Sequence, residues 1–113
     1  ADHRDDTSAL WRALADLLSG RAHDAERALR ALTSHPDLRG RALLHLGVVL
    51  LATHRDQEAQ ETLIAATECA SEASDEARVM LVERAQRAGN TAEARRWANA
   101  INDPWMRREV SPD

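Results

Sequence analysis

The chain has 113 residues, close to the common size of a single domain. Its hydrophobic fraction of 43% and charged fraction of 30% exclude an intrinsically disordered chain. The formal net charge of −4 argues against non-specific nucleic-acid binding and against a polybasic membrane patch. The longest apolar stretch, Leu46 to Ala52, is too short to span a bilayer. We therefore expect one globular domain that binds neither nucleic acid nor membrane.

Alanine, leucine and arginine dominate the composition, and no alternating run of β-branched or aromatic residues is present, so helices are predicted throughout. In chain order, three short turns at Gly20, His54 and Gly89 each precede a predicted helix with an alanine five residues on. These alanines are 34 and then 35 residues apart, which indicates an internal repeat. Residues four and seven positions after each alanine lie on the same helix face. The nine aligned residues are Ala25, Leu29, Leu32, Ala59, Leu63, Ala66, Ala94, Ala98 and Ile101.

A second helix is predicted upstream of each turn. The central one reads Leu43-x-x-Leu46-Gly47-x-x-Leu50, the first reads Trp11-x-x-Leu14-Ala15-x-x-Leu18, and the third reads Arg78-x-x-Leu81-Val82-x-x-Ala85. In this alignment the first unit needs a turn two residues shorter than the central unit. The pattern resembles the tetratricopeptide repeat, W-x2-L-G-x2-Y followed by A-x3-F and a proline.

The resemblance implies an all-α fold of antiparallel helix-turn-helix repeats, stacked as a short right-handed superhelix of about six helices. We expect a single domain, residues 1–113, with repeats at about 6–39, 40–74 and 75–108. Asp103-Pro104 predicts a short capping helix over 103–109, because an N-cap residue followed by proline starts a helix. The resemblance also implies that Trp11 fills a core position and that Gly47 lies close to Ala59. Trp105 is expected to dock the terminal helix, or to anchor a partner if it faces solvent.

Members of this family bind other proteins in a concave groove lined by the first helix of each repeat. The resemblance implies seven groove residues here: Arg41, Leu44, Val48, Leu51, Val79, Glu83 and Arg87. The central helix is apolar on almost every side, so Leu44, Val48 and Leu51 either face a partner or are covered by neighbouring helices. The expected function is a non-catalytic scaffold or adaptor that binds a peptide or helix of a partner protein. The alternatives are a homo-oligomerisation module and a regulatory domain of a larger bacterial regulator.

No residue pattern supports catalysis, a metal or a cofactor, and we expect none of the three. The five histidines are not spaced as zinc ligands, and the four glycines are scattered singly rather than forming a phosphate loop. Cys69 is the single cysteine and is expected to be a small apolar core residue. Because a single cysteine cannot form a disulfide within the chain, we expect a reducing compartment and hence the cytoplasm. Ala1 in place of methionine suggests a domain excised from a longer protein.

Overall fold

The structure is a computed structural model that describes the backbone of residues 3–110 and the side chains of residues 8–110. All regular structure in this range is helical. The helices run in the order α1 His3–Leu18, α2 Ala22–Leu32, α3 Arg39–Ala52, α4 Asp56–Thr67, α5 Ala73–Arg87, α6 Thr91–Ala100 and α7 Pro104–Val110. The all-α class expected from the sequence is confirmed.

The same turn joins α1 to α2, α3 to α4, and α5 to α6. Its left-handed residue is Gly20, His54 or Gly89, with φ of 83°, 61° and 74°. The amide after each donates to a carbonyl five residues back, at 2.7 Å from Arg21 to Asp16, 2.9 Å from Arg55 to Leu50 and 2.8 Å from Asn90 to Ala85. This pattern is a Schellman motif, which satisfies the last carbonyls of one helix and reverses the chain into the next.

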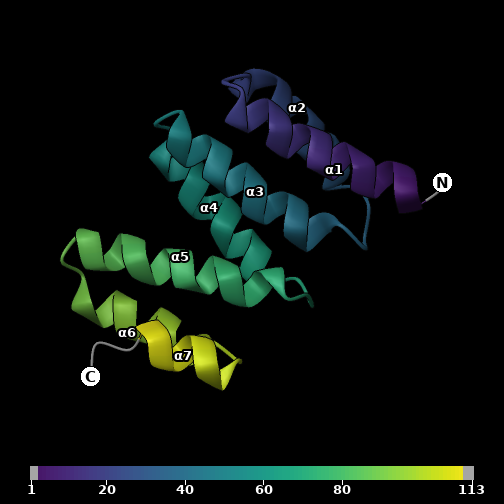
Figure 1. The fold of residues 1–113 in the computed structure, drawn as a ribbon. Coiled ribbons are helices and arrows are strands. Elements are labelled where there is room, and N and C mark those ends of the chain that lie inside the picture. The colour runs from purple at the N-terminus through teal and green to yellow at the C-terminus, as the bar shows by residue number, and fades with distance from the viewer. Residues whose placement is uncertain (1–2, 111–113) are drawn as a thin grey trace.

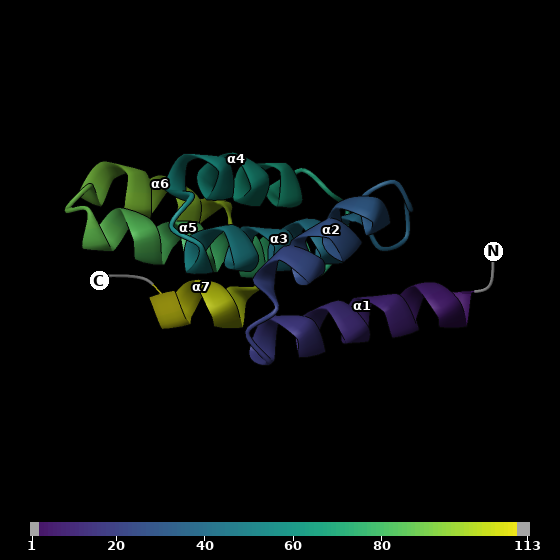
Figure 2. The ribbon, with the colours of Figure 1, turned by 90° about the horizontal axis from the view of Figure 1, so that it is seen from above.

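Each even-numbered helix packs against the odd-numbered helices before and after it. Each helix packs against the next one along the chain, and in addition α3 contacts both α1 and α5, while α5 contacts α7. Figure 1 shows α1, α3, α5 and α7 following one another from top to bottom. Figure 2 shows α4 and α6 along the upper edge, α2 at the level of α3 and α5, and α1 and α7 along the lower edge. The result is a flattened, elongated body of 43 × 27 × 19 Å.

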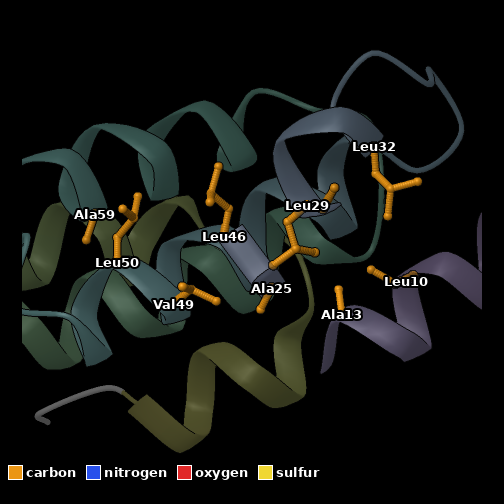
Figure 3. Packing of buried hydrophobic residues seen from close by; sticks show 10 residues of the cluster. Leu10, Ala13, Ala25, Leu29, Leu32, Leu46, Val49, Leu50 and Ala59 are labelled. Carbon is orange, nitrogen blue, oxygen red and sulfur yellow. The ribbon is translucent and has the colours of Figure 1, made fainter. Parts of the chain in front are cut away.

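The nine aligned residues of α2, α4 and α6 are all buried, as expected for residues on one helix face. Figure 3 shows how they meet the odd helices: Ala25, Leu29 and Leu32 of α2 lie between α1 and α3. A second cluster joins α3, α4 and α5 around Leu63, and a third joins α5 and α6 around Val82. The core therefore runs the length of the molecule as three consecutive clusters, each filled by neighbouring helices.

Gly47 marks the closest approach between α3 and α4. A methyl group built on Gly47 would lie 2.6 Å from Cδ2 and 2.8 Å from Cγ of Leu63, so the absence of a side chain is required there. The three atoms nearest to that methyl group all belong to Leu63. Ala59 belongs to the first cluster, together with Leu46, Val49 and Leu50 of α3, and its closeness to Gly47 stays a prediction.

The register expected for the first helix is wrong. The three turns have equal length, so Leu44 and Gly47 of α3 correspond to Leu10 and Ala13 of α1, 34 residues earlier in each case. Leu10 and Ala13 are buried, whereas Trp11, expected in the core, is 66% exposed. The first helix also begins at His3, three residues before the expected start of the first repeat.

Candidate functional site

The seven expected groove residues divide into core and surface. Leu44 is 3% exposed and packs with Leu63 and Leu81, so for this residue the alternative of a covered core position holds. Val48, Leu51 and Val79 are partly buried, while Glu83 and Arg87 are exposed. Arg41 is partly buried and is considered below. Of the three apolar residues expected on α3, only Val48 and Leu51 are partly exposed, and Leu51 also packs against the first and second core clusters.

The corrected register extends this apolar surface onto α1. The residues 34 positions before Val48 and Leu51 are Leu14 and Leu17, and both are likewise partly buried. The next residue, Leu18, is 88% exposed. We call Leu14, Leu18, Val48, Leu51 and Val79 the odd-helix surface. The misplaced register hid Leu14 and Leu18, although the equal spacing of Gly20, His54 and Gly89 would have found them.

An ion pair connects α3 to α5 beside this surface. Arg41 Nη1 donates to Glu76 Oε2 at 2.9 Å, so Arg41 is engaged within the chain rather than free for a partner. His45 lies one turn after Arg41. Burial lowers the pKa of His45, the positive charge of Arg41 lowers it further, and Glu76 acts in the opposite direction. The imidazole is therefore held neutral near pH 7.

An apolar pocket lies between α5 and α7. Its volume is about 260 Å³, and it is lined by Glu76 and Val79 of α5 and by Trp105, Met106, Glu109 and Val110 of α7. We call it the α7 pocket. Trp105 is 67% exposed, so it faces solvent and does not dock the helix. Sequence reasoning did not find this pocket, because it depends on where α7 lies against α5.

Asp75 fixes the start of α7. Its carboxylate accepts hydrogen bonds from the backbone amides of Asn102 at 2.9 Å and Asp103 at 3.0 Å, and from Arg78 Nη1 at 2.8 Å. Burial raises the pKa of Asp75, but the two amides and Arg78 together outweigh burial and hold this pKa below its usual value. Arg78 also donates to the carbonyl of Thr67 at 3.0 Å, which ties the end of α4 to the same cluster.

The expected cap of α7 is present. Asp103 Oδ1 accepts from the amide of Trp105 at 2.8 Å, and Pro104 occupies the first helical position. The terminal helix, Pro104–Val110, thus begins and ends one residue later than the expected 103–109.

On the even-numbered side, charged residues connect α2 to the start of α4. Arg55 Nη1 lies 2.6 Å from Glu26 Oε1, and Arg30 bridges Glu26 at 3.0 Å and Glu58 at 3.4 Å. The hydrogen bond from Arg55, aided by Arg30, lowers the pKa of Glu26 against the opposing effect of burial. These groups are paired with one another, and their ion pairs connect α2 to the start of α4.

Among the described residues, no group of three or more His, Cys, Asp or Glu side chains is arranged to hold a metal ion. Cys69 is partly buried, and its thiol contacts the carbonyl of Ala65 at 3.6 Å. Within residues 3–110, no helix has both the length and the apolar character needed to cross a bilayer.

Comparisons of the chain with models of protein families, with curated proteins and with solved structures found no match in any of the three.

Proposed function

We propose that the chain is a short tetratricopeptide-like solenoid that binds a peptide or helical segment of a partner protein on its odd-helix surface. The observation that carries the proposal is that Leu18 is 88% exposed on α1, and that Leu14 of the same helix and Val48 and Leu51 of α3 are partly exposed. Large apolar side chains exposed together on adjacent helices are typical of protein-binding surfaces. The free Cys69 agrees with a cytoplasmic, reducing environment for such a module.

Two features of the fold support the solenoid part of the proposal. The same Schellman turn recurs at 34 and 35 residues, and each turn positions a buried alanine on the following helix. The contacts of α3 with α1 and α5, and of α5 with α7, are those of stacked hairpins that touch only their neighbours. In such a stack the first helices of the hairpins form one face, with α1 and α7 projecting at its two ends (Figure 2).

A capture experiment with matched variants tests the proposed surface. The wild-type chain, Val48→Asp and Ala92→Asp are immobilised and exposed to extract of the source organism. Ala92 is exposed on α6, so its variant introduces the same charge on the even-numbered side. We expect a partner that is retained by wild type and by Ala92→Asp and lost by Val48→Asp.

Circular dichroism of each variant separates loss of binding from loss of fold. Leu44→Asp should unfold the chain, because it buries a charge among Leu63 and Leu81. Val48→Asp should leave the helical signal unchanged. If Val48→Asp also unfolds the chain, or if it retains the partner as wild type does, the proposed surface is wrong.

Self-association is the second candidate, since Trp11 at one end of the stack and Trp105 at the other are both largely exposed. Copies that meet head to tail would bring Trp11 of one copy against Trp105 of the next, and such contacts give dimers and longer oligomers. Sedimentation that gives a dimer mass at micromolar concentration, and a monomer mass for Trp11→Ser, would favour this function. A monomer at all accessible concentrations would exclude it.

A further inference from the structure

The α7 pocket has the size and lining of a site for one side chain. Its volume of about 260 Å³ lies below the range of about 300–1,000 Å³ that is usual for small-molecule sites. Its walls are the apolar parts of Val79, Met106 and Val110, together with the ring of Trp105. Burying an apolar anchor of a partner in such a pocket is the usual source of binding energy in a peptide interface.

The terminal helix α7 is held at its beginning by hydrogen bonds and near its end by Val110, which packs against the cluster of α5 and α6. No residue of α7 is fully buried. Asp75 holds the preceding amides of Asn102 and Asp103, and Arg107 donates to the carbonyl of Ile101 at 3.0 Å and 2.6 Å. Trp105 does not fill the space, since two-thirds of it is exposed. The helix therefore forms one wall of the pocket, and the largely exposed Trp105 is one of its lining residues.

The charges around the pocket are mainly acidic. Glu76 and Glu109 line it, and Glu83 is exposed one turn along α5 from Val79. Arg41 pairs with Glu76, which leaves Glu109 as the lining carboxylate available to an incoming cation. The two arginines of α7, Arg107 and Arg108, do not line the pocket. A basic segment therefore fits this site better than an acidic one.

From these observations we infer that the α7 pocket receives one large aliphatic or aromatic side chain of a partner segment whose neighbouring residue is arginine or lysine. The cation lies between the carboxylate of Glu109 and the face of the Trp105 ring, where a carboxylate and an aromatic face both attract it. The inference rests on the proposed function, and it adds the chemistry of the segment that is bound.

Random 12-residue peptides displayed on phage and selected on the immobilised chain are the probe. We expect the selected peptides to carry a large apolar residue next to arginine or lysine. As synthetic peptides they should bind Trp105→Ser about tenfold or more weakly than wild type, since a central aromatic contact is lost. Ala92→Asp, on the even-numbered side, should bind as wild type does.

Charge reversal at Glu109 is the second arm, because Glu109 is exposed and its replacement does not disturb the core. Glu109→Arg should weaken the basic peptides about threefold or more, and it should improve matched peptides in which glutamate replaces the cation. Selected peptides without the apolar–cationic pair, equal binding to Trp105→Ser, or failure to select any peptide would overturn the inference. Peptides that lose affinity in Val48→Asp but not in Trp105→Ser would overturn it while supporting the proposed function.

Discussion

The left-handed residue is glycine in two of the three turns and histidine in the third, so we predict that replacing glycine destabilises the chain and that introducing glycine stabilises it. Gly20, His54 and Gly89 all have positive φ, and a side chain at Gly20 or Gly89 would meet no atom within 4 Å. The effect of adding one is therefore purely that of the backbone. A left-handed conformation costs a residue with a side chain about 1–2 kcal/mol, and the greater freedom of glycine in the unfolded chain offsets about 0.4–1 kcal/mol of this. Gly20→Ala and Gly89→Ala should each lower the free energy of unfolding by about 0.5–1 kcal/mol.

At the central turn the same reasoning gives the opposite sign. His54 is exposed and adopts the left-handed conformation that is unfavourable for a residue with a side chain. Because glycine adopts this conformation without that cost, His54→Gly should raise the free energy of unfolding by about 0.5–1 kcal/mol. Urea denaturation followed by far-ultraviolet circular dichroism measures all three variants, with His54→Ala as the control that keeps a side chain at this position. Destabilisation by His54→Gly, or stabilisation by either alanine variant, would refute the equivalence of the turns.

Three further predictions concern packing and charge. Gly47→Ala should destabilise the chain by about 1–2 kcal/mol, because the clash of the new methyl group with Leu63 costs about 1–3 kcal/mol and exceeds the gain in helix propensity. Urea denaturation measures this change, and an unchanged midpoint would contradict the contact. Asp75→Ala should cost about 2–4 kcal/mol by removing an acceptor of three hydrogen bonds, and hydrogen exchange should speed up in α7. Since the folded pKa of Asp75 is lowered from 3.8, its contribution is present above that pH and is lost as the pH falls below it. The folded pKa of His45 is lowered from 6.5, so the unfolded chain binds the proton more readily and the free energy of unfolding should decrease as the pH falls below about 6.5. His45→Gln should make the free energy of unfolding depend less steeply on pH in this range. An equally steep dependence in the variant would contradict the prediction.

The even-numbered helices were predictable because their signal is local and repeated. An alanine followed by apolar residues at four and seven positions requires only helical periodicity, and all nine such residues are buried. The cap at Asn90 was predictable for the same reason. Asn90 Oδ1 accepts from the amide of Glu93 at 3.1 Å, a bond between residues three apart.

The odd-numbered helices were harder to place, since each contacts helices on several sides. Trp11 matches an aromatic position of the repeat pattern, which predicts a core residue, but Trp11 is 66% exposed. The turn residue Gly20 was the stronger marker, because a Schellman turn fixes the register of the helix before it. Aligning the helices on the turns places Leu10 and Ala13, instead of Trp11, in the core.

The candidate site depended on contacts that no short pattern contains. Whether Leu44 faces a partner or the core is decided by how closely α5 approaches α3, and Leu44 is buried against Leu81. The α7 pocket likewise depends on Asp75, whose bonds to Asn102 and Asp103 cross 27 and 28 residues of sequence. Non-local hydrogen bonds of this kind leave no periodic signal.

The central claim is that a partner segment binds the side of the molecule formed by the odd-numbered helices. Amide chemical shifts of the isotope-labelled chain, recorded as the captured partner is added, test this most directly. The predicted result is a set of shift changes concentrated on α1, α3, α5 and α7, around Leu18, Val48 and Val79, with α2, α4 and α6 little affected. Changes concentrated on α2, α4 and α6 would contradict the claim.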